Sequence, residues 1–152
     1  FGMNCAGTEA TIAALKSGGV TSATIMVPCP WFPMAVEFAK NNPQANLGVH
    51  TTLTSEWSKY KWGPVLGQTA VPSLVDELGY FWPDVAPVCQ HATLEEVEKE
   101  VRAQIDRALK AHGKPRMALE VAEAMAAPDS PGVPRLLASV VENAVRLARF
   151  ST

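Results

Sequence analysis

The chain has 152 residues, of which 47% are hydrophobic, and it carries a formal net charge of −2 at pH 7. This length is enough for one compact domain with a single core. The charge gives no strong positive field to hold a nucleic acid or an anionic membrane, so neither is expected as a partner. Three widely spaced cysteines indicate neither a disulfide framework nor a zinc ribbon, and together with the absence of a recognisable secretory signal they predict a cytoplasmic protein.

Periodicity predicts an alternation of helices and strands in the first third of the chain. Thr8 is predicted to cap a short helix that ends at Gly18. The residues 20–27 are rich in β-branched types and predict a buried strand, 31–40 predicts a helix, and 47–54 predicts a second strand. Strand, helix and strand at this spacing form a βαβ unit, which implies parallel strands and an α/β fold.

The middle of the chain combines a long segment of low periodicity with a strongly patterned helix. Segment 55–91 holds most of the aromatic residues among several prolines, and a loop of this length is typical of a functional segment. Thr93 and Glu96 have the spacing of a capping box, which predicts a helix that runs to Gly113. The mixed-sign charges of 95–110 are predicted to form its solvated face.

His50 is the candidate site residue of the second predicted strand. It lies toward the carboxyl end of that strand, where active sites of α/β folds gather, and on the face opposite the apolar one together with Thr52. A single histidine is more often structural than a ligand, since a metal site needs further partners. His91 is predicted to be a solvated loop residue, and Cys29 a small buried residue near the end of the first strand.

Several ordered stretches of this sequence resemble the YdjC-like (ChbG/HpnK) carbohydrate deacetylases. The resemblance covers about residues 1–115. It rests on the run GGVTSATIMVPCPWFPMAVEFAKNNPQANLGVHTTLTSEW, followed by YKWGPV, VPSLVDELGYFWPD and EEVEKEVRAQIDRAL. It implies a modified (β/α) barrel and a metal-dependent hydrolase, using Mg or Zn, that removes N-acetyl groups from sugars such as chito-oligosaccharides.

The resemblance also implies a ligand set that this chain contains only in part. In the family pattern the metal is held by the second Asp of Asp-Asp-Phe-Gly, by the histidine matched by His50, and by a later histidine motif; the first Asp is the general base. Phe1 and Gly2 match the end of the first motif, so the base is expected before Phe1. No histidine follows His112. We therefore expect a partial deacetylase domain over 1–116, an incomplete copy of the family enzyme.

The Ala-rich residues 117–152 are expected to be a divergent tail, interpreted as a truncation or reading-frame artefact. An amphipathic helix is predicted within it over 133–150. Because a partial barrel would leave strand edges open, the chain is also predicted to be able to form a homodimer.

An N-acetylated oligosaccharide is the expected partner, with Thr52, Trp57 and Trp62 as substrate-binding residues. Flat indole rings can stack on sugar rings, although tryptophans in a long segment can equally fix it to the body of the protein. Two other functions stay open on the residues alone. One is a non-catalytic sugar-binding or interaction module, and the other is a different metal-dependent barrel hydrolase.

Overall fold

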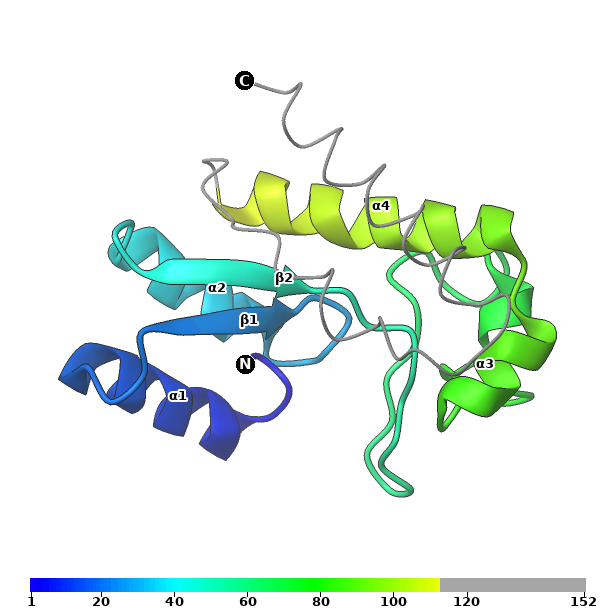
Figure 1. Cartoon of the computed structure of the whole chain (residues 1–152), viewed down its shortest axis with the longest axis horizontal. Helices are drawn as coiled ribbons and strands as arrows, with labels where there is room; N and C mark the ends of the chain where they lie inside the picture. The colour runs from blue at the N-terminus through cyan, green and yellow to red at the C-terminus, as the bar shows by residue number, and fades with distance from the viewer. Residues whose placement is uncertain (113–152) are drawn as a thin grey trace, which may run out of the picture.

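The structure, a computed structural model, describes residues 1–112. In chain order its elements are α1 (Cys5–Ser17), β1 (Ser22–Met26), α2 (Phe32–Asn41), β2 (Asn46–His50), the 3-10 helix η1 (Pro72–Leu74), α3 (Val85–His91) and α4 (Leu94–His112) (Figure 1). The tail 117–152 and its predicted helix lie outside the described residues. Among the described helices, none combines the length and apolar character needed to cross a bilayer.

The sheet confirms the predicted βαβ unit. β1 and β2 are parallel and pair in register from Ser22 with Asn46 to Met26 with His50, with α2 between them in the chain. The backbone N–H of Met26 also donates to the carbonyl of Phe1 at 2.8 Å, so the first residue lies beside the end of β1. Residues 1–112 thus show a partial α/β fold with a two-stranded sheet, too few strands to close a barrel.

The first helix starts earlier than predicted. Asn4, not Thr8, is its N-cap, and the Asn4 side chain accepts a hydrogen bond from the Gly7 N–H at 2.8 Å. Thr8 lies inside α1 and is fully buried, where its hydroxyl oxygen accepts from the Gly2 N–H at 3.1 Å. The predicted stop is confirmed: Gly18 caps α1 with φ of 75°, a conformation that glycine adopts without strain.

The second strand ends four residues earlier than predicted, at His50. The predicted alternation of buried and exposed residues is absent, since Leu47, Gly48 and Val49 are all buried, and so are the neighbours Thr52 and Leu53. The backbone of Thr52 bonds to the side chain of Gln104. Thr52 therefore does not lie on one strand face with His50.

The segment after β2 is partly ordered into short elements that its low periodicity did not predict. It contributes η1 and α3, and His91 is the last residue of α3, so its prediction as a loop residue is wrong. The side chain of His91 is exposed but stacks on Trp82, with 4.6 Å between ring centroids. This aromatic contact fixes the end of α3 to the preceding loop.

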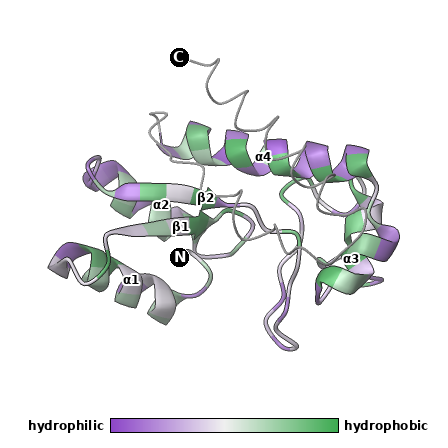
Figure 2. Cartoon of the chain, viewed as in Figure 1, coloured by the Kyte–Doolittle hydropathy of each residue, from purple (hydrophilic) through white to green (hydrophobic). Residues whose placement is uncertain are grey.

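Two hydrophobic clusters hold the described residues together. In one, α2 packs on the sheet, through residues that include Ile25, Phe32, Phe38, Leu47 and Val49. In the other, the segment after β2 packs on α4, through Leu53, Trp62, Val71, Leu74, Phe81, Val97, Val101 and Ile105. α4 joins the two clusters, because Ala108 belongs to the first and Val97 to the second. Figure 2 shows the resulting division of α4 into hydrophobic and hydrophilic positions.

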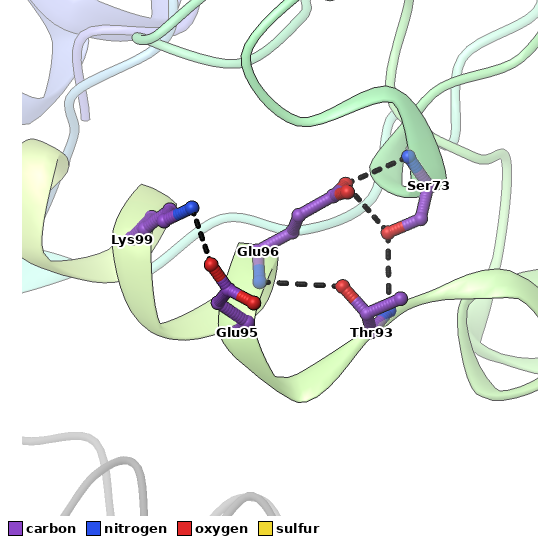
Figure 3. A network of polar contacts seen from close by, with 5 residues as sticks. All are labelled: Ser73, Thr93, Glu95, Glu96 and Lys99. Atoms are coloured by element: carbon purple, nitrogen blue, oxygen red, sulfur yellow. Dashed lines mark hydrogen bonds and ion pairs between the residues drawn. The ribbon is translucent and has the colours of Figure 1, made fainter.

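A serine from η1 takes part in the predicted capping box of α4 (Figure 3). The Glu96 N–H donates to the Thr93 hydroxyl at 3.4 Å, as a capping box requires. The Glu96 carboxylate, however, accepts from the backbone N–H and the hydroxyl of Ser73, at 2.8 and 2.6 Å. The hydroxyl of Ser73 in turn accepts from the Thr93 N–H at 3.0 Å. The hydrogen bonds at the N-terminus of α4 therefore also hold η1 against the start of this helix.

The charged residues of α4 do not all face solvent. Glu95 pairs with Lys99 and Glu98 pairs with Arg102, each four residues apart on the exposed face, as predicted. Glu100 belongs to the same run of charges but is 0% exposed, so its assignment to the solvated face is wrong. The physical reason is that its carboxylate accepts hydrogen bonds inside the protein, from the backbone N–H groups of Val65 and Leu66 and from the side chain of Gln104.

Candidate functional site

His50 occupies the carboxyl end of the parallel sheet. It is the last residue of β2 and pairs in register with Met26, the last residue of β1. Phe1 is hydrogen-bonded beside Met26, and Cys29 follows three residues after β1. Three chain segments thus meet at the edge of the sheet where ligands bind in parallel α/β folds.

The surroundings of His50 favour its neutral form. Partial burial of the imidazole lowers the pKa of His50, and the Glu56 carboxylate acts in the opposite direction. A neutral imidazole keeps a nitrogen lone pair free to bind a metal ion or accept a proton. His50 is also exposed as a residue at the end of β2.

Cys29 is buried beside this site, as predicted. Burial of the thiol raises the pKa of Cys29 to about 12, and the Glu56 carboxylate adds to the rise. The nucleophilic form of cysteine is the thiolate, which is scarce at neutral pH for such a group. Cys29 therefore forms part of the wall of the site and is not poised as a nucleophile.

Thr52 uses its polar groups within the protein. Its side chain and backbone are 4% exposed overall. Its N–H donates to Gln104 Oε1 at 2.9 Å, and its carbonyl accepts from Gln104 Nε2 at 2.8 Å. Its hydroxyl donates to the carbonyl of His50 at 3.0 Å. These contacts fit a residue that holds His50, and the predicted contact of Thr52 with a substrate stays a prediction.

Glu100 and Gln104 form a buried polar pair that the sequence analysis missed. Glu100 accepts hydrogen bonds from the backbone N–H groups of Val65 and Leu66, at 2.8 and 3.1 Å, and from Gln104 Nε2 at 2.8 Å. The signal was available in the helical spacing: both residues lie on the same stripe of α4 as Val97, Val101, Ile105 and Ala108. Glu and Gln at two positions of an otherwise apolar stripe predict that both side chains are buried and have hydrogen-bond partners inside the protein.

The two candidate tryptophans lie in different surroundings. Trp57 is 53% exposed, so a face of its ring is open to solvent. Trp62 is 3% exposed and belongs to the core; its indole N–H donates to the carbonyl of Thr54 at 2.8 Å. Tyr60, between them, donates to the carbonyl of Met3 at 2.6 Å and so ties this segment to the start of the chain. The burial of Trp62 fits the alternative in which it fixes the segment.

The described residues contain no complete metal site. No three His, Cys, Asp or Glu side chains within residues 1–112 are grouped closely enough to hold a metal ion. A catalytic zinc site uses about three protein ligands. His50 therefore fits as a single ligand, the donor set of the described part of the chain is incomplete, and no chemical step through a metal follows from it.

Comparison with known proteins identifies the protein family. A family model described as YdjC-like protein matches residues 1–117. The chain belongs to the YdjC-like protein family.

Curated relatives and a solved structure agree with this membership. A carbohydrate deacetylase of Enterococcus faecalis is 39% identical over 140 residues, which cover 83% of this chain and 52% of that protein. A carbohydrate deacetylase of Thermus thermophilus is 37% identical over 103 residues, or 68% of this chain and 35% of that protein. This chain therefore spans about half of the length of such relatives, or less.

The solved structure is an Enterococcus faecalis protein named for cellobiose-phosphate cleavage. It matches with a TM-score of 0.78 and 33% identity, over 97% of this chain and 53% of that one. The likeness supports the arrangement of elements described above.

Proposed function

We propose that this chain is part of a metal-dependent carbohydrate deacetylase with a (β/α) barrel, and that His50 is one of its metal ligands. The observation that carries the proposal is the place of His50, a partly exposed imidazole with a lowered pKa at the carboxyl end of a parallel strand. The relatives named carbohydrate deacetylases supply the reaction class. The proposed substrate is an N-acetylated sugar of the chito-oligosaccharide type.

The proposed reaction adds water across the amide bond and releases acetate and the free amino sugar. A divalent metal ion held by His50 together with the family's other ligands would supply Lewis-acid chemistry, which would polarise the acetyl carbonyl and favour attack by water. In this chain, His50 offers a nitrogen lone pair, and Trp57 offers an exposed ring on which a sugar can stack. The general base and the remaining ligands are proposed to come from the family's Asp-Asp pair and later histidine motif.

A second candidate follows from the solved structure that is named for cellobiose-phosphate cleavage. On this alternative the substrate is a phosphorylated disaccharide and the broken bond is not an amide. The two candidates release different products, which makes them separable in one assay.

The test compares this chain with an extended version of the relatives' full length, in which the family's segment ending in Asp-Asp precedes Phe1 and the family's remaining sequence, with its Thr-His-x-Asp-x-His motif, follows Pro115. Each protein is loaded with Zn²⁺ or Mg²⁺ and given N-acetylated chito-oligosaccharides and, separately, cellobiose phosphate. We expect acetate release from the extended version and none above background from the 152-residue chain. Glucose release from cellobiose phosphate without acetate release would select the second candidate. Acetate release by the shorter chain at the extended version's rate would show that the ligands are wrongly assigned.

A further inference from the structure

We infer that Gln104 of α4 is a positioning residue for His50, and that Glu100 sets the orientation of Gln104. The inference rests on the proposed function only in treating His50 as the site residue. A chain of hydrogen bonds runs from the side chains of Glu100 and Gln104 on α4, through Thr52, to the backbone carbonyl of His50.

The first step is the way in which Gln104 binds the chain beyond β2. One carboxamide bonds both backbone groups of Thr52, since Oε1 accepts its N–H at 2.9 Å and Nε2 donates to its carbonyl at 2.8 Å. A neighbouring strand would satisfy these two groups in the same manner. The Gln104 side chain therefore takes the place of a strand partner at the point where β2 ends.

The second step connects Thr52 with His50. The Thr52 hydroxyl donates to the carbonyl of His50 at 3.0 Å, and only Thr51 separates the two residues. On its other side, His50 is paired with Met26 in the sheet. We call the two hydrogen bonds between Gln104 and the backbone of Thr52 the clamp. The backbone of His50 is held by β1 on one side and, through Thr52, by this clamp on the other, which limits the positions of its imidazole.

The third step explains why the carboxamide of Gln104 has one orientation. Its Nε2 donates a second hydrogen bond to Glu100 Oε1 at 2.8 Å. A carboxylate can only accept, so it requires the nitrogen end of the amide on its side. The reversed amide would place Oε1 against the carbonyl of Thr52 and the carboxylate of Glu100. Glu100 itself is fixed by the N–H groups of Val65 and Leu66.

Burial makes the clamp hard to replace. Glu100 and Gln104 are 0% exposed and Thr52 is 4% exposed. Without Gln104, the Thr52 N–H and carbonyl would be left buried and unpaired, so the chain after His50 would shift to find water or another partner. A displacement of this kind reaches the imidazole, and active sites respond strongly to misplacement by about 1 Å.

The experiment uses the complete 152-residue chain and nuclear magnetic resonance. Gln104→Leu keeps the size of the side chain and removes both of its polar groups. Val97→Ala is the matched control, because Val97 is buried on the same helix and belongs to the cluster beside the segment after β2. The two readouts are the hydrogen exchange rate of the Thr52 amide relative to that of Val49, and the ring signals of His50.

We expect Gln104→Leu to raise the relative exchange rate of the Thr52 amide at least tenfold and to shift or broaden the ring signals of His50. Val97→Ala should leave both readouts as in the parent chain. Unchanged readouts in Gln104→Leu, or equal changes in both variants, would overturn the inference.

A second pair keeps the test decisive if Gln104→Leu fails to fold. Thr52→Val has nearly the shape of threonine and removes only the hydroxyl, whereas Thr52→Ser keeps it. We expect the ring signals of His50 to shift in Thr52→Val and to shift less in Thr52→Ser; the same shift in both would overturn the inference. Neither pair uses acetate release, so a failed clamp and a failed deacetylase assignment give separate results.

Discussion

At the scale of single residues, burial decides which polar side chains can act on a ligand. His50 is partly exposed at the end of a strand, whereas Thr52 and Trp62 are buried and bonded within the protein. Trp57 is the exposed member of the predicted substrate-binding set. Of the predicted site residues, His50 and Trp57 are therefore accessible to a ligand, whereas Thr52 and Trp62 are bonded within the protein.

Cys29 gives a prediction about pH at this scale. Because burial raises the pKa of Cys29 to about 12, the thiolate fraction at pH 8 is about one in ten thousand. We expect iodoacetamide at pH 8 to modify the exposed Cys89 in the native chain and to leave Cys29 unmodified until urea unfolds it. Peptide mass spectrometry after timed labelling measures both. Modification of Cys29 at the rate of Cys89 would contradict its burial.

The same shift has a consequence for stability. The native state keeps the Cys29 proton at pH values where the unfolded state, with a pKa near 9, releases it. The free energy of unfolding should therefore fall as the pH rises from about 9 toward 12. Cys29→Ala should reduce this slope, and urea titrations of both chains across that range measure the difference. An identical slope in the two chains would mean that Cys29 is not the group responsible.

At the scale of elements, local patterns predicted the order of helices and strands, and distant contacts decided their ends. The βαβ unit and the Gly18 stop follow from short-range rules, because β-branched runs and left-handed glycines act within a few residues. The end of β2 does not, since it depends on Gln104, which lies 52 residues after its partner Thr52. Likewise, η1 depends on the packing of Leu74 against α4, and the end of α3 is held by the stacking of His91 on Trp82.

Ser73 provides the prediction for an element. Its hydroxyl bridges the Glu96 carboxylate and the Thr93 N–H, so it serves both η1 and the first turn of α4 (Figure 3). Ser73→Ala removes the bridge and should lower the free energy of unfolding by about 1–2 kcal/mol. Urea denaturation followed by circular dichroism measures this loss. Lys99→Ala, which removes an exposed ion pair of the same helix, is the control and should leave the midpoint nearly unchanged. Equal midpoints for Ser73→Ala and the parent chain would contradict the role of the bridge.

At the scale of the whole molecule, residues 1–112 form two clusters joined by α4, with the candidate site at the end of the sheet (Figure 1). The sequence located His50 at this edge because the carboxyl ends of parallel strands are recognisable from periodicity. It could not locate the clamp, because Glu100 was interpreted as one charge in a solvated run and its partners Val65 and Leu66 lie in an irregular segment. The place of Glu100 on the apolar stripe of α4 indicated its burial, but the backbone donors that bind its carboxylate cannot be recognised in an irregular segment.

The central proposal about the whole protein is that His50 binds the metal ion of a carbohydrate deacetylase. The most direct test is acetate release from N-acetylated chito-oligosaccharides by the extended version, compared with its His50→Ala and His91→Ala variants. His91 is the matched control, because it is also an exposed histidine but stacks on Trp82 away from the sheet edge. We predict a loss of at least a hundredfold in kcat/KM for His50→Ala, together with loss of stoichiometric metal, and a rate within about twofold of the parent for His91→Ala. Undiminished acetate release by a folded His50→Ala variant would contradict the claim.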